Sequence, residues 1–82
     1  MLLLGQLLDV LDDNERVIIR SSTERSLTFI EEVLLSQAKP RLTRDARKCS
    51  VACIYSDNSE HAKGETVTVI YIRPNGYFVT LE

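Results

Sequence analysis

Two segments in the second half of the chain, residues 47–56 and 65–73, constrain the fold more than any other feature. In each of them the side chains alternate with the period of a β-strand. A polar loop, residues 57–64, separates them, and Pro74-Asn75-Gly76 follows as a strong turn signal, because Pro fixes φ and Asn and Gly accept positive φ. With a further strand over 77–81, the pattern predicts a three-strand antiparallel meander.

The first half of the chain begins with a predicted helix and a predicted strand. Leucines recur at i, i+3, i+4 and i+7 within residues 2–12, which is typical of an amphipathic helix. Asp12-Asp13-Asn14 ends this pattern, because such residues prefer turns to a helix interior. The β-branched run at residues 16–20 then predicts a strand.

Residues 26–38 fit two interpretations. Apolar residues at helical spacing, together with a capping box from Thr28 to Glu31, favour a helix from Phe29 to Gln37 that ends before Pro40. A strand over residues 26–30 that leads into a short helix fits the same segment equally well.

These elements predict one α+β domain over residues 1–82. We expect an N-terminal helix, one strand, a helix-containing crossover and the meander, which together form a four-stranded, mostly antiparallel sheet. The chain is 44% hydrophobic and 27% charged, which is near the average for globular domains. A chain of 82 residues forms a modest hydrophobic core. Such a core leaves little free energy of folding to support a strained active site.

The leucine-rich start does not have the pattern of a signal peptide, because no basic segment precedes it and no small-residue cleavage site follows. No stretch approaches the roughly 20 apolar residues that span a bilayer. We therefore expect a cytoplasmic protein that does not associate with membranes.

Neither a catalytic residue nor a metal or cofactor site is predicted. The alternation places Cys49, Val51, Cys53 and Tyr55 on one face of a strand. The Cα atoms of the two cysteines would then lie roughly 13 Å apart, too far for a disulfide or for one tetrahedral metal. The single histidine, His61, lies in the polar loop at a spacing that matches no familiar ligand pair.

Two charged clusters and one aromatic cluster are candidate partner-binding surfaces, within a net charge of −2. The acidic patch comprises Asp9, Asp12, Asp13 and Glu15, and the basic patch comprises Lys39, Arg41, Arg44, Arg47 and Lys48. A basic run can neutralise phosphates or bind an acidic protein surface. The aromatic residues Tyr55, Tyr71, Tyr77 and Phe78 are expected near one another on the meander, where they stabilise the sheet or, on an uncovered face, anchor a partner.

The segment from Leu7 to Ile19, with its leucine-rich helix, acidic turn and Val-Ile-Ile strand, resembles the start of small accessory proteins encoded in phages and prophages of Gram-positive bacteria. Those proteins are mostly of unknown function. The resemblance implies an origin in a mobile element and assigns no functional residue.

Together these observations predict a non-enzymatic protein-interaction module that inhibits a host protein, such as a defence nuclease, by surface binding. The alternative is a small nucleic-acid-binding or regulatory domain that uses the basic patch, although a net negative chain is not typical of that class. A strand over residues 77–81 would leave an edge through which two copies pair.

Overall fold

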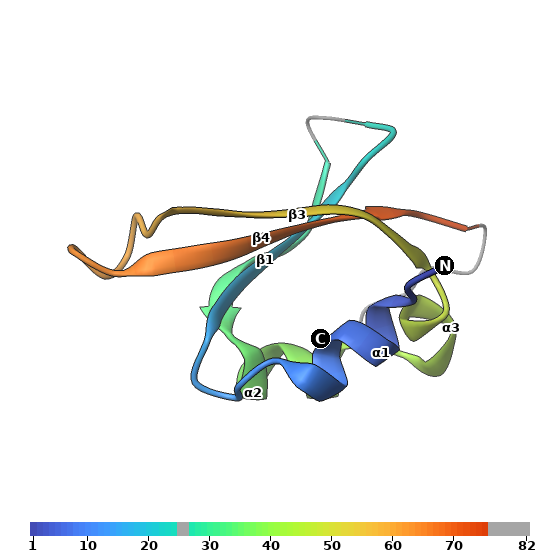
Figure 1. Ribbon diagram of the computed structural model, residues 1–82, viewed down its shortest axis with the longest axis horizontal. Coiled ribbons are helices and arrows are strands. Elements are labelled where there is room, and N and C mark those ends of the chain that lie inside the picture. Colours follow the sequence, from blue (N-terminus) through green and yellow to red (C-terminus); the bar gives the residue numbers. More distant parts are fainter. Residues whose placement is uncertain (25–26, 76–82) are drawn as a thin grey trace.

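The chain folds into a four-stranded sheet with its helices on one side (Figure 1). This structure is a computed structural model that describes residues 1–24 and 27–75. Within them the order of elements is α1 (Leu4–Val10), β1 (Arg16–Ser21), β2 (Thr28–Leu34), α2 (Leu35–Ala38), the 3-10 helix η1 (Lys39–Arg41), α3 (Arg44–Arg47), β3 (Ser50–Asn58) and β4 (Thr66–Arg73). The predicted α+β class is confirmed.

The sheet is mixed, with the strand order β2-β1-β4-β3. β1 and β2 are antiparallel, β3 and β4 are antiparallel, and β1 and β4 run parallel to each other in the centre. The predicted mostly antiparallel sheet with a three-strand meander is therefore wrong. β4 has β1 on one side and β3 on the other, so β1 occupies the place that a third meander strand needs. Residues 77–81, where that strand and its edge were expected, lie outside the described residues.

Residues 28–34 form a strand, so the favoured helix from Phe29 to Gln37 is wrong over most of its length. Only the short α2 that follows is helical, as the second interpretation of this segment required. The error has a physical cause in the register: Val17 pairs with Val33 but Ile19 pairs with Ile30, so β2 carries one extra residue between them. Such a bulge places two residues three positions apart on the same face, which imitates helical spacing.

A second bulge divides β3 into two parts. Val51 pairs with Ile72 while Cys53 pairs with Tyr71, so Ala52 is an extra residue in β3. The alternation changes phase at that point. The expectation that Cys49 and Val51 share a face with Cys53 and Tyr55 is therefore wrong.

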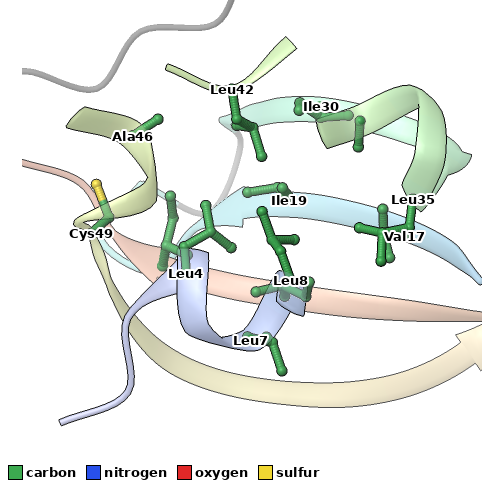
Figure 2. Packing of buried hydrophobic residues seen from close by; sticks show 13 residues of the cluster. Leu4, Leu7, Leu8, Val17, Ile19, Ile30, Leu35, Leu42, Ala46 and Cys49 are labelled. Carbon is green, nitrogen blue, oxygen red and sulfur yellow. The ribbon is translucent and has the colours of Figure 1, made fainter. Parts of the chain in front are cut away.

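The core lies between the helices and one face of the sheet (Figure 2). Leu4 and Leu8 of α1 lie over β1, where Val17 and Ile19 point toward the helices, and Leu35 of α2 closes the layer. The remaining buried members of this cluster are Leu7, Ile30, Ala38, Leu42, Ala46, Cys49, Ile70 and Ile72. Burial of branched side chains at roughly 25 cal/mol per Å² is the main force that holds the helices to the sheet.

The N-terminal segment is fastened to the start of β3. The amide of Leu4 donates to the carbonyl of Cys49 at 2.8 Å, and the amide of Val51 donates to the carbonyl of Leu2 at 2.8 Å. In α1, a Cβ atom on Gly5 would lie 3.1 Å from the Cβ of Arg47. A residue without a side chain at this position lets α1 approach α3 closely.

The two thiols lie in different environments, which generates a prediction. Cys49 is 2% exposed within the core, and Cys53 is exposed on β3. We expect a maleimide to modify Cys53 of the native protein rapidly and Cys49 only after unfolding, because a buried thiol reacts through opening of the structure.

Mass spectrometry of the timed reaction measures both rates, with urea-unfolded protein as the control in which both thiols react. A Cys53→Ser variant should retain one slowly reacting thiol. Rapid labelling of that variant would contradict the assignment of Cys49 to the core.

Candidate functional site

The face of the sheet opposite the helices, called the open face below, carries the most distinctive group of side chains. Strand register places on it Ile18, Arg20, Cys53, Tyr55, Asp57, Val67, Val69 and Tyr71. Figure 1 shows α1, α2 and α3 on the opposite side of the sheet. Among the described residues, no helix covers the open face.

Tyr55 and Tyr71 stack on each other on neighbouring strands of the open face. Their ring centroids lie 5.8 Å apart with an interplanar angle of 23°, and their hydroxyl groups are 3.4 Å apart. Tyr55 remains accessible, since the residue is 42% exposed. The expected association of tyrosines is confirmed for this pair, whereas Tyr77 and Phe78 lie outside the described residues.

Arg20 lies beside this pair, on the other side of β4 from β3. It is paired in register with Tyr71, and its guanidinium group is within hydrogen-bonding reach of the Tyr71 hydroxyl. The hydrogen bond from Tyr55 and the adjacent Arg20 guanidinium lower the pKa of Tyr71 below its ordinary value, because both stabilise the phenolate. The bond to Tyr71 raises the pKa of Tyr55.

A second polar cluster surrounds Glu32 of β2, whose side chain is only 3% exposed. Its carboxylate accepts hydrogen bonds from the Ser59 hydroxyl and from the amide of Glu60 at 3.3 Å. It also lies 3.4 Å from Nη1 of Arg16, whose Nε lies 3.0 Å from Glu65. These contacts hold the β3–β4 loop against β2, and they give this cluster a structural role.

The acidic patch is partly used inside the fold. Asp12 Oδ1 accepts from the amide of Asn14 at 2.8 Å, Asp13 Oδ1 lies 2.7 Å from Nζ of Lys39, and Glu15 Oε2 accepts from Thr68 at 3.3 Å. The carbonyls of Asp13 and Glu15 accept the first amides of α2, at 3.0 and 2.8 Å. Asp9 remains exposed on α1, and Asp12, three positions later, is also exposed.

The basic patch is divided in the same way. Lys39 pairs with Asp13, and the Arg47 guanidinium donates to the carbonyl of Lys39 at 2.6 Å. Arg44 and Lys48 are exposed, and Arg41 is half-buried. Since Lys39 and Arg47 have structural contacts, the cations left for a partner are fewer than the sequence indicated.

The remaining candidates do not assemble into a reactive centre within residues 1–24 and 27–75. No three histidine, cysteine or acidic side chains come together there as a metal site. His61 is exposed in the β3–β4 loop, where its amide donates to Ser59. An open groove of about 640 Å³, beside the start of β1, is lined by Asn14, Glu15, Arg16, Ser56, Gly64, Glu65, Thr66 and Thr68. None of the described helices is long and apolar enough to cross a membrane.

Arg20 and Glu32 are the residues that sequence reasoning missed. In the sequence, Arg20 is one of the charged residues that end the short apolar run 17–19. Glu32 lies inside the helix predicted from Phe29 to Gln37. Only the parallel pairing of β1 with β4 brings Arg20 to Tyr71, and only the return of the β3–β4 loop brings Ser59 to Glu32. No local pattern in the sequence signals either contact.

The chain matches no protein-family model, no curated protein and no solved structure.

The division of the basic patch generates a stability prediction. We expect Arg47→Gln to lower the free energy of unfolding by about 1–3 kcal/mol, because it removes a charged donor from the partly buried carbonyls of Lys39 and Leu42. Arg44→Gln, three residues earlier on the exposed surface, should change it by less than about 0.5 kcal/mol. Urea denaturation measures both values. Equal effects of the two substitutions would contradict the structural role of Arg47.

The environment of Glu32 generates a pH prediction. The Ser59 hydrogen bond, with the Glu60 amide and nearby positive charge, lowers the pKa of Glu32 below its ordinary value of 4.5 despite burial, which raises it. A lowered folded-state pKa stabilises the protein fully above the ordinary value, and this contribution disappears as pH falls through the folded-state pKa.

We therefore expect Glu32→Gln to destabilise the protein most near neutral pH, by about 1–3 kcal/mol, and progressively less in acid. Urea midpoints from neutral pH down to about pH 2 measure this difference. The matched control is Glu31→Gln, which alters the exposed neighbour. A difference between wild type and Glu32→Gln that stays constant with pH would contradict the expected linkage.

Proposed function

We propose that this chain is a non-enzymatic protein-interaction module that binds its partner through the open face. The observation that carries the proposal is the stacked Tyr55–Tyr71 pair beside Arg20 on a sheet face that no described helix covers. Tyr and Arg are the residue types that most often dominate binding energy at protein interfaces. Ile18 on the same face is half-buried, whereas Val67 and Val69 are only 1% and 2% exposed and offer no contact surface themselves.

The narrower form of this proposal is an accessory protein of a phage or mobile element that inhibits a host protein, such as a defence nuclease, in the cytoplasm. It is supported by the small size, the net negative charge and the resemblance of residues 7–19 to such proteins. In this form the exposed Asp9 and Asp12 would lie against basic residues of the host protein.

A comparison of binding by three variants tests the proposal. The tagged wild-type chain captures proteins from a Gram-positive bacterial lysate, and the affinity of each captured protein is then measured with purified components. We expect Tyr55→Ser to weaken the affinity for the specific partner by at least about tenfold, as is typical when an interface anchor is removed.

Val10→Ser is the matched control, because it removes a 78% exposed apolar residue from the helix side. It should leave binding through the open face unchanged, and because Val10 adjoins Asp9, a loss of affinity would indicate that the acidic patch contacts the partner. Asp9→Lys with Asp12→Lys tests the acidic patch, and a loss of affinity that depends on salt would support its participation.

A partner that binds Tyr55→Ser as tightly as wild type would overturn the open-face proposal. Tight, salt-dependent binding of DNA or RNA that is lost on reversal of Arg44 and Lys48 would instead support the basic-patch alternative.

A further inference from the structure

The Nε atom of Arg20 is buried and has no hydrogen-bond partner among the described residues. Buried polar atoms in native proteins nearly always have a partner, and an unsatisfied one costs free energy. The cost is larger for a group that carries charge. Arg20 is therefore held on the open face in a position that its present neighbours satisfy only in part.

The neighbours of Arg20 supply two further hydrogen-bonding groups on the same side of the sheet. The Tyr71 hydroxyl lies within reach of the guanidinium, and the Tyr55 hydroxyl lies 3.4 Å from that of Tyr71. One cation and two phenolic hydroxyl groups thus form a row across β1, β4 and β3. The single hydroxyl hydrogen of Tyr55 is donated to Tyr71, so Arg20 and the Tyr71 hydroxyl hold the hydrogens that this row can donate to the oxygens of an anion.

The surrounding charges favour an anion with a single charge over a polyanion. Glu31 and Asp57 act electrostatically on Arg20 and Tyr55, respectively. Arg16 is already paired with Glu32 and Glu65. A nucleic-acid strand carries one phosphate per nucleotide and requires a series of cations along its path. The open face instead carries the carboxylate of Asp57, two residues from Tyr55 on β3.

We propose that Arg20, Tyr71 and Tyr55 form a recognition site for a carboxylate side chain of the partner protein, and this inference rests on the proposed function of the open face. The planar guanidinium matches the geometry of a carboxylate and binds it through two parallel hydrogen bonds. Since Nε is covered in the free protein, the guanidinium turns outward when the carboxylate binds. In the complex, Nε of Arg20 then donates to the carboxylate, whereas in the free protein it has no hydrogen-bond partner among the described residues.

Titration of the full-length, isotopically labelled chain with sodium acetate tests the site. The arginine Nε–Hε signals are followed by NMR, and the Arg20 signal is assigned by its loss in Arg20→Lys. Sodium chloride at equal ionic strength is the control. The chain has three tyrosines and no tryptophan, so tyrosine emission gives an independent readout.

We expect a saturable shift of the Arg20 signal with a Kd on the order of 10 mM, as suits so small a ligand. The acetate-dependent change in tyrosine emission should disappear in Arg20→Gln. The affinity for acetate should fall by about two- to tenfold in Tyr71→Phe, which removes one hydrogen-bond donor. Arg44→Gln is the matched control and should bind as wild type does.

Equal shifts in acetate and chloride would overturn the carboxylate site. Binding of inorganic phosphate, or of a short oligothymidylate, more than about tenfold tighter than acetate would overturn it in favour of a phosphate ligand. Both titration results are independent of the effect of Tyr55→Ser on partner binding in the capture experiment. A chain that loses its partner on Tyr55→Ser but gives no specific acetate shift retains the proposed function and lacks this site.

Discussion

The parallel pairing of β1 with β4 is the contact on which the rest of the structure depends. It joins two antiparallel pairs, β1–β2 and β3–β4, that are otherwise local in sequence. Its register sets Ile19 beside Ile70 toward the helices and Arg20 beside Tyr71 on the opposite side. A shift by one residue would exchange these faces. The same pairing therefore positions both the core and the proposed binding surface.

The sequence predicts best where side-chain periodicity is undisturbed. β4 pairs with β1 without a register shift and lies within the segment whose alternation indicated a strand, and β1 lies where a short β-branched run indicated it. Prediction failed in β2 and β3, because each contains a residue that one-dimensional periodicity cannot assign to a bulge. The parallel β1–β4 contact was also missed, because it joins residues about fifty positions apart, for example Val17 with Thr68.

The candidate surfaces were predicted less well than the fold, because charge clusters in a sequence do not show which charges the fold itself uses. Asp13 and Lys39 were assigned to opposite patches, yet they form an ion pair that fastens the turn after α1 to the end of α2. An exposed ion pair of this kind contributes little to stability, but it reduces the charge that each patch offers to a partner. The tyrosine pair was foreseen because its aromatic residues fall on adjacent strands.

The open face depends on the bulge at Ala52. Upstream of it, Val51 faces the core, and downstream of it Tyr55 faces away from the helices. If Ala52 instead took its turn in an unbulged alternation from Val51 onward, Tyr55 would lie on the helix side and Ile54 on the open face. Tyr55 would then have no contact with Tyr71, and the row that begins at Arg20 would end on β4. Because bulges often redirect a side chain beside a functional site, this one links an irregularity of β3 to the surface that we propose for binding.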